Sequence, residues 1–243
     1  IGYGRFGRLA AHHLKKDFRI FVSDSGGNIR PERGVRMVPL PEAALKKFIV
    51  LAVPIGKLRQ VLRSIAPHLS PGTVVCDVCS VKEEPIRWMK AILPGHTALL
   101  GMHPLFGPDS AARVCTGRRI VLCPVRISRS GVSHIARYLR KRGLIVSRMS
   151  ARKHDELMAS SLFLTQLIGH TLLRLNLPAG DLSTSNYRKL TGIARTTGHD
   201  SPKLLNDMYR FNRHAGKTTR LLVKGLAQLA RELSGHRRHA PSS

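Results

Sequence analysis

Apolar residues in the first 148 positions come in short runs, separated by segments whose apolar residues recur at helical spacing. Near-continuous apolar runs of this length are typical of strands buried on both faces of a parallel sheet. The predicted strands are 18–22, 48–54, 73–78, 97–100, 119–123 and 144–148. The predicted helices are 8–14, 57–68, a segment ending near residue 93, and 131–142. This alternation predicts an α/β domain over residues 1–149 with a Rossmann-type, doubly wound parallel sheet.

The pattern changes after residue 150, where no strand pattern remains and Leu157, Leu164 and Ile168 recur at helical spacing. The predicted helices are 154–175, 187–197, 202–215 and 221–233, with residues 177–180 ending the first and Ser201-Pro202 beginning the third. We therefore expect an all-α second domain over residues 150–236, followed by a disordered tail at 237–243. Helical domains with long apolar faces often supply a dimer interface.

A glycine-rich turn, Gly2-x-Gly4-x-x-Gly7, precedes the first predicted helix. In dinucleotide-binding folds the first glycine permits a tight turn, the second lets the backbone approach a pyrophosphate, and the third lets helix and strand pack closely. Asp24 follows the next strand, at the spacing of a carboxylate that binds the adenine ribose. The predicted cofactor contacts are Gly2, Gly4, Arg5, Phe6, Gly7, Asp24, Ser25, Val53 and Pro54.

The identity of the dinucleotide depends on the residues around Asp24. A carboxylate repels the 2′-phosphate of NADP, which favours NAD. Ser25, Asn28 and Arg30 follow at once and offer groups that bind a phosphate. NAD is the preferred expectation, and NADP stays open.

The strand that should precede the glycine turn is reduced to Ile1. In this fold that strand is central, and its loss would leave unpaired backbone groups on two neighbouring strands, which is costly when they are buried. We therefore expect either that the natural protein begins upstream or that this chain is less stable than its parent.

Candidate chemistry centres on the segment 101–108, whose prolines and glycines predict a rigid loop just past the end of a strand. The segment contains His103, at the place where open α/β sheets carry their chemistry. A single His often serves only to hydrogen-bond a carbonyl group. The glycine turn upstream favours a catalytic His103 instead.

Ser80 lies at the carboxyl end of another predicted strand, 73–78. It suits a helix N-cap, because Glu83 three residues later would complete a capping box. It also suits a role in the site, and one Ser can serve both.

Composition adds limits to this picture. The chain has 243 residues, of which 42% are hydrophobic, so it can bury a proper core. It has no apolar run long enough for a transmembrane helix and no signal peptide is expected. Cys76 and Cys79 form a C-x-x-C motif without a matching second pair. We therefore expect no metal site, a buried strand position for Cys76, and a reducing cytoplasm.

The formal net charge of +27 is extreme for an enzyme of small molecules and favours anionic partners, including nucleic acid. The basic residues are spread along the whole chain, and aromatic residues make up only 5%. We therefore interpret the charge mostly as a solvated surface, with nonspecific adhesion of nucleic acid.

Several motifs together resemble the prephenate and arogenate dehydrogenases of tyrosine biosynthesis. The resemblance runs from residue 1 to about residue 233. It rests on the runs 1–7, 51–54, 77–82, 102–108, 154–155, 163–169 and 211–215, of which the Ser80 and His103 motifs are the most specific.

The resemblance implies an NAD(P)-dependent oxidative decarboxylation. It assigns His103 as the base that accepts the proton of the substrate hydroxyl, Ser80 as its support near the nicotinamide, and Arg213 as the ligand of a substrate carboxylate. It also implies a Rossmann domain, a helical homodimer interface, a cytoplasmic or plastid location, and no membrane. Gln166 stands where family members often carry His, and Cys79 replaces a commoner small residue, so these positions are expected to alter substrate preference.

Prephenate is slightly preferred over arogenate, because no acidic residue near the predicted site obviously suits an ammonium group. Two further alternatives remain: another two-domain dehydrogenase of a hydroxy acid, and a basic nucleic-acid-binding protein on a degenerate Rossmann fold.

Overall fold

The computed structural model describes residues 1–26, 29–112, 114–176 and 183–237. The chain divides into two compact units, Ile1–Asp155 and Glu156–Ser243, and each is described by itself. Within the described part of the chain, no helix combines the length and the apolar character needed to cross a bilayer.

The first unit contains a five-stranded sheet in the order β3-β4-β5-β6-β7. Its strands are β3 (Phe48–Leu51), β4 (Val74–Asp77), β5 (Ala98–Pro104), β6 (Arg119–Arg126) and β7 (Ile145–Arg148). All neighbours are parallel except β5 and β6, which are antiparallel. The Rossmann-type α/β class is confirmed, but the expectation of a wholly parallel sheet is wrong at β6. The connection from β5 to β6 carries only a short helix, so it provides no crossover helix that spans the sheet.

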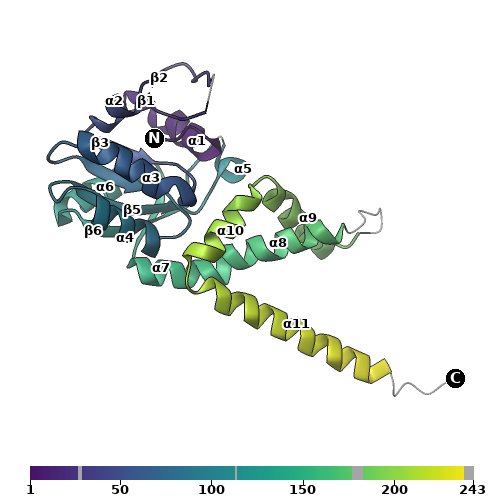
Figure 1. Cartoon of the computed structure of the whole chain (residues 1–243). Helices are drawn as coiled ribbons and strands as arrows, with labels where there is room; N and C mark the ends of the chain where they lie inside the picture. The colour runs from purple at the N-terminus through teal and green to yellow at the C-terminus, as the bar shows by residue number, and fades with distance from the viewer. Residues whose placement is uncertain (27–28, 113, 177–182, 238–243) are drawn as a thin grey trace. The chain divides into compact units, whose positions relative to one another are not determined.

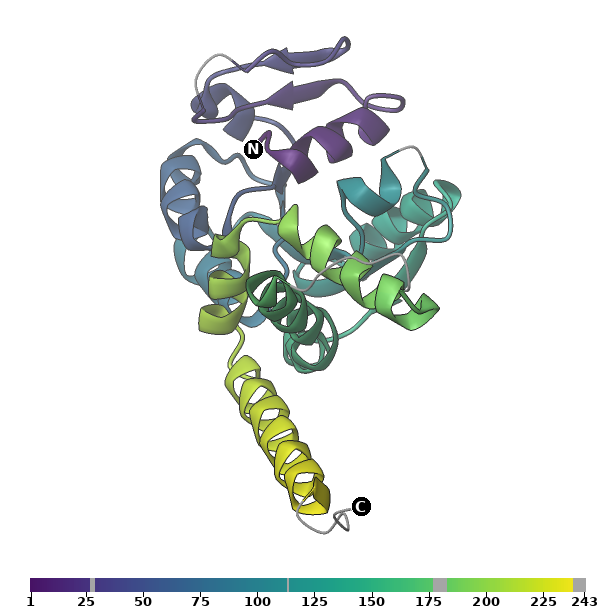
Figure 2. The ribbon, with the colours of Figure 1, turned by 90° about the vertical axis from the view of Figure 1, so that its right-hand side faces the viewer.

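Helices flank both faces of this sheet (Figures 1 and 2). They are α1 (Arg5–Leu14), α2 (Leu40–Ala44), α3 (Ile55–Ile65), α4 (Glu83–Ile92), α5 (Pro108–Ala111) and α6 (Arg129–Lys141). Helix α6 buries Val132, Ala136 and Leu139 against β4, β5 and β6, where Cys76 lies fully buried on β4 as predicted. These residues form one hydrophobic core of the unit.

A separate pair of parallel strands, β1 (Ile20–Val22) and β2 (Val35–Met37), is not joined to the larger sheet. The first residues of the chain form hydrogen bonds to both sides of the interval. Ile1 N donates to Val50 O and Ala52 N donates to Ile1 O, both at 2.8 Å, while Gly2 N donates to Ser23 O on the other side. Ile1 thus lies between β1 and β3, where the first strand was predicted. A cavity of about 840 Å³ lies beside it, lined by residues of β1, β3, α1 and α6.

The second unit is helical, as predicted. It contains the end of α7 (Ala151–Met158), a π-helical turn (Ala159–Phe163), α8 (Leu164–Leu175), α9 (Ser185–Gly198), α10 (Pro202–Phe211) and α11 (Ala215–Arg237). Phe163, Met208 and Ala215 form its small core. Helix α10 begins at Pro202 after the N-cap Ser201, at the predicted position.

Several predicted boundaries are wrong. The single helix 154–175 is interrupted by the π-helical turn, where the hydroxyls of Ser160 and Ser161 both donate to Leu157 O and compete with the helical amides. The third helix ends at Phe211 rather than Ala215. The short elements β2, α2 and α5 fall outside the predicted strands and helices. Residue 237 of the predicted tail is helical, whereas 177–180 and 238–243 lie outside the described residues.

Candidate active site

The glycine turn packs tightly against the end of β3. Gly2 has φ +93°, and a Cβ there would lie 2.4 Å from the carbonyl oxygen of Ala52. A Cβ on Gly7 would lie 2.1 Å from the carbonyl oxygen of Gly2. Neither position admits a side chain, which agrees with the roles predicted for the first and third glycines.

Gly4 has a different environment, because a Cβ there would meet nothing within 4 Å. It is the N-cap of α1 and supplies no side-chain acceptor, and the first turn of that helix contains no acidic residue. The first amides of α1 therefore face open space with the positive end of the helix dipole, an arrangement that fits a pyrophosphate. Arg5 lies beside them in an ion pair with Asp109, and Phe6 lines the cavity.

Asp24 fixes the turn from the side of β1. Its carboxylate accepts hydrogen bonds from Tyr3 N at 2.5 Å and from Gly26 N at 2.7 Å. Each oxygen keeps a further lone pair, so a ribose hydroxyl can still donate to it. Ser25 and Arg30 are exposed nearby in the chain, whereas Asn28 lies outside the described residues.

The predicted site residues of the first unit lie along one sheet edge. Since β3, β4 and β5 are parallel, their carboxyl ends meet there. Val53 and Pro54 follow β3, Ser80 follows β4, and His103 stands near the end of β5. His103 was expected in a loop and is instead a strand residue paired with Val121 of β6, because the antiparallel partner extends β5 to Pro104.

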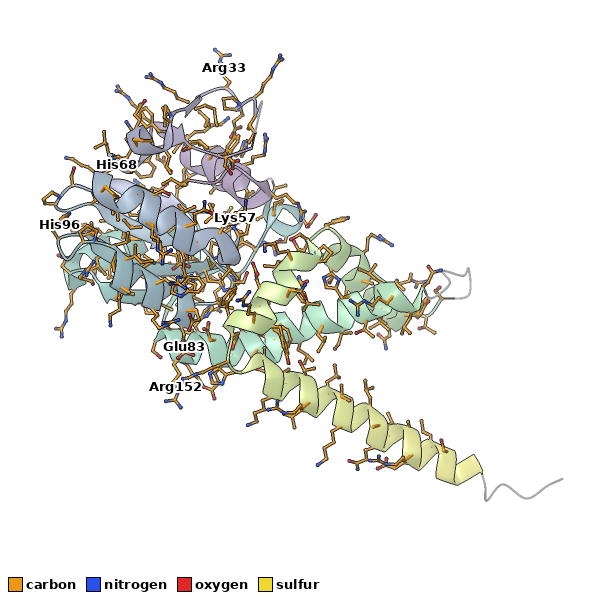
Figure 3. The ribbon with its side chains drawn as sticks, viewed as in Figure 1. Arg33, Lys57, His68, Glu83, His96 and Arg152 are labelled. Atoms are coloured by element: carbon orange, nitrogen blue, oxygen red, sulfur yellow. The ribbon has the colours of Figure 1, made fainter. Side chains whose placement is uncertain are left out.

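His103 is buried and contacts two residues at the start of α7. Its Nδ1 atom lies 2.8 Å from Nε2 of His154, and Nδ1 of His154 lies 2.7 Å from Oδ1 of Asp155. Asp155 accepts further hydrogen bonds from Lys82 N at 2.7 Å and Glu83 N at 2.9 Å. Figure 3 labels Glu83 at the start of α4, next to α7.

Burial controls the protonation of both imidazoles. Desolvation lowers the pKa of His103 well below its ordinary value, and the neighbouring His154 and Lys82 act in the same direction, because each disfavours a cation beside it. Desolvation also lowers the pKa of His154, although its hydrogen bond to Asp155 opposes that shift. Both rings are therefore neutral near pH 7, so His103 is ready to accept a proton.

A buried ion pair lies behind His103. Lys82 is fully buried, and its ammonium group donates to the carboxylate of Asp77 and, at 2.7 Å, to the carbonyl oxygen of Met102. It thereby ties the end of β4 to the residue preceding His103. Burial raises the pKa of Asp77, and the charge of Lys82 opposes that rise. Among the described residues, no cluster of three or more His, Cys, Asp or Glu side chains could hold a metal ion.

Ser80 does not cap α4, so that interpretation is wrong. Helix α4 begins at Glu83 with Lys82 as N-cap, and the carboxylate of Asp155 takes the amides that a capping side chain would bind. Nδ1 of His103 contacts His154 and not Ser80. Ser80 keeps its place at the sheet edge, half-buried between β4 and α4.

Two predicted substrate ligands belong to the second unit. Gln166 is buried on α8, and its amide group donates to Asp200 at 2.8 Å while its oxygen has no hydrogen-bond partner. Arg213 is exposed in the turn between α10 and α11, not on a helix as expected. The helix ends before it because Asn212 leaves helical geometry and its side chain accepts a hydrogen bond from His214 N.

Sequence reasoning assigned no role in the site to Lys82, His154 or Asp155. The adjacent titratable pair at 154–155 was visible within the motif that carried the resemblance. A functional role for it was not, because its partners lie 51 and 73 residues away in the chain.

Two known protein families and several individual proteins are similar to this chain in sequence. A family described as prephenate dehydrogenase, nucleotide-binding domain, matches residues 35–148, and one described as TYRAAT1-like, C-terminal domain, matches residues 171–243. The chain is 28% identical to arogenate dehydrogenase 2, chloroplastic, of Arabidopsis thaliana, over 97% of this chain and 69% of that protein. It is 26% identical to a probable arogenate/prephenate dehydrogenase of Methanocaldococcus jannaschii, over 87% of this chain and 50% of that one. The chain therefore spans only part of the length of these relatives.

Solved structures show the same fold. Prephenate dehydrogenase from A. aeolicus, in complex with hydroxyphenyl propionate and NAD+, superposes with a TM-score of 0.74 at 19% identity, covering 96% of this chain and 88% of that one. Synechocystis arogenate dehydrogenase superposes with a TM-score of 0.67 at 22% identity, covering 95% of this chain and 88% of that one.

Proposed function

We propose that the chain is a member of the prephenate/arogenate dehydrogenase family and that it oxidises prephenate to 4-hydroxyphenylpyruvate with NAD(P)+ and loss of carbon dioxide. The observation that supports this most directly is a buried His103 at the same sheet edge as the glycine turn. A neutral imidazole at that place can remove a hydroxyl proton where a nicotinamide could lie.

The proposed cofactor is held by backbone and by Asp24. The first amides of α1 bind the pyrophosphate, and the carboxylate of Asp24 binds the adenine ribose. NAD is preferred over NADP, since the charge of Asp24 repels a 2′-phosphate. When bound, the nicotinamide accepts a hydride from the ring carbon that carries the hydroxyl group.

Side chains of the protein transfer the hydroxyl proton and bind the two carboxylates of the substrate. The hydroxyl proton passes to Nε2 of His103 as hydride leaves the same carbon. The C–C bond to the ring carboxylate then breaks, carbon dioxide departs, and the bonding electron pair makes the ring aromatic as a phenolate. His103 returns its proton to that phenolate, so protons balance. Ser80 orients the reacting ring, while Arg213 and Gln166 bind carboxylate oxygens, Arg213 through its planar fork of donors.

Arogenate is a second candidate, and one contact favours it. Gln166 donates to Asp200 at 2.8 Å, so a carboxylate does lie next to a proposed substrate ligand. This contact weighs against the expectation that no acidic residue near the site suits an ammonium group. Asp200 would suit the ammonium group by which arogenate differs from prephenate.

The test measures NADH and NADPH formation with prephenate and with arogenate. We expect turnover with at least one pair and a fall of about a hundredfold in kcat for His103→Asn, with cofactor binding retained. His96→Gln is the matched control, since His96 bonds Leu69 O at the opposite end of β5. Absence of turnover with both substrates, or a normal rate in His103→Asn, would contradict the proposal.

We also propose that a second copy of the chain covers the apolar side of α11. Leu226, Leu229 and Leu233 recur at coiled-coil spacing and are each more than half exposed. Sedimentation equilibrium should show a dimer that Leu229→Glu weakens. A parent chain that stays monomeric at micromolar concentration would refute this.

A further inference from the structure

We propose that His154 and Asp155 are positioning residues that hold His103 in one tautomer, with the proton on Nδ1 and the reactive lone pair on Nε2. The consequence for the reaction rate rests on the proposed function. The tautomer assignment itself rests only on hydrogen bonds within the first unit.

Asp155 determines which atom donates in each hydrogen bond of the series from Asp155 through His154 to His103. Backbone amides can only donate, and two of them, from Lys82 and Glu83, point at the two oxygens of its carboxylate. With an amide N–H directed at each oxygen, the carboxylate is the acceptor at both of its atoms. Nδ1 of His154, 2.7 Å from Oδ1, must therefore carry the proton of that bond.

The same reasoning carries over to His103. A neutral His154 with its proton on Nδ1 presents a lone pair at Nε2, which lies 2.8 Å from Nδ1 of His103. Two lone pairs cannot face each other at this distance, so Nδ1 of His103 donates. Nε2 of His103 is then unprotonated, and no described residue makes a hydrogen bond to it.

If His154 donated to His103 instead, His154 would carry protons on both ring nitrogens and would be a cation. His154 and Asp155 have no exposed surface and His103 is only 4% exposed, so water does not compensate such a charge. The ammonium group of Lys82 in the same buried region disfavours a second cation. Neutral His154 is thus the state that the surroundings select.

The arrangement also stabilises the product of proton transfer. When Nε2 of His103 takes the substrate proton, the ring becomes a cation and its bond to His154 becomes charge-assisted. Asp155 lies at the other end of His154 with its charge held in place by α4. The pair therefore orients the ring before the reaction and opposes part of the burial cost during it.

The tautomer can be read without any turnover. Nitrogen NMR of protein labelled with ¹⁵N in histidine distinguishes protonated from unprotonated ring nitrogens, and the His103→Asn spectrum assigns the signals. We expect His103 and His154 both to be protonated at Nδ1 and bare at Nε2 near pH 7. A His103 ring protonated at Nε2 in the parent protein would overturn the proposal, whether or not the enzyme turns over prephenate.

A second measurement uses Asp155→Asn. An amide at this position has one acceptor group and one donor group, so it cannot satisfy Lys82 N, Glu83 N and His154 Nδ1 together. Turning its NH₂ group toward His154 reverses both rings. We expect the His103 signals to change to the Nε2-protonated form and kcat to fall about a hundredfold, with KM for the cofactor unchanged.

Asp155 also accepts from the first amides of α4, so Asp155→Asn changes the cap of that helix as well. A pair of variants at His154 separates the two effects. The side-chain oxygen of Gln can replace the acceptor at Nε2, whereas Phe fills the space without an acceptor. We expect His154→Gln to keep His103 protonated at Nδ1 and His154→Phe to lose this preference, at similar melting temperatures. Equal tautomer populations in the two variants would show that His154 only fills space.

Discussion

Gly4 and Gly7 belong to the same turn but differ in what surrounds them. A Cβ on Gly4 meets nothing within 4 Å, and its φ of −68° suits any residue. Gly4→Ala should therefore fold normally, with a melting temperature close to that of the parent. The added methyl group would lie where the pyrophosphate passes, so we expect NAD+ affinity to fall about tenfold or more.

Gly7→Ala should behave differently, because its Cβ would lie 2.1 Å from the backbone carbonyl oxygen of Gly2. We expect a loss of about 3 kcal/mol in unfolding free energy. Urea unfolding and fluorescence titration with NAD+ measure both quantities on the same samples. If Gly4→Ala bound NAD+ as tightly as the parent, the pyrophosphate would not lie at this turn.

At the scale of single residues, the sequence predicts what depends on local spacing. Gly2, Gly7 and Asp24 are recognisable because one turn and the strand after it fix their positions. The contact between Lys82 and Asp155 is not predictable in this way, since 73 residues separate them and only the packing of α7 against α4 brings them together. The same applies to the protonation of His103, which depends on burial.

At the scale of elements, the two glycines Gly169 and Gly192 allow a matched test in the helical unit. Gly169 on α8 packs against α9, where a Cβ would lie 2.3 Å from Oγ1 and 2.8 Å from Cβ of Thr197. Gly169→Ala should therefore cost about 1–3 kcal/mol of unfolding free energy, because the helices would have to move apart.

Gly192 lies on α9 itself, and a Cβ there meets nothing. Gly192→Ala should raise the unfolding free energy by about 0.5–1 kcal/mol through helix propensity alone. Urea denaturation followed by circular dichroism measures both variants. A gain in stability for Gly169→Ala would mean that α8 and α9 do not pack through this residue.

Element type was predictable over most of the chain, whereas ends that depend on a partner were not. The strand β5 seemed to end before Gly101 because Gly and Pro follow, yet pairing with β6 carries it to Pro104. Helix α10 ended early because Asn212 bonds the backbone beyond it. In both cases a specific contact overrides the average preference of the residue types.

At the scale of the whole first unit, a polypeptide that begins at Ile1 places a charged group between β1 and β3. Its terminal ammonium group donates to Val50 O, and burial lowers the pKa of that group from 8.0 to about 6. The unfolded chain therefore binds more protons between pH 6 and pH 8, so stability should rise with pH across this range. A pKa difference of two units corresponds to about 2.7 kcal/mol of unfolding free energy. The folded state has this stability above pH 8 and loses it as the pH falls toward 6.

Extending the chain before Ile1 should remove this cost, because a peptide link replaces the buried ammonium group. Two extensions of four residues, the length of β3, separate charge from packing. Gly-Ser-Gly-Ser should abolish the rise in stability between pH 6 and pH 8 without filling the cavity of about 840 Å³. Val-Val-Ile-Val should do the same and raise the melting temperature further, since each buried side chain contributes about 1.5–3 kcal/mol and the new strand can pair with both β1 and β3. Ordering each added residue costs about 1–2 kcal/mol, so a net gain requires the side chains to enter the cavity. Equal melting temperatures for the two extensions at pH 8 would show that no strand inserts between β1 and β3.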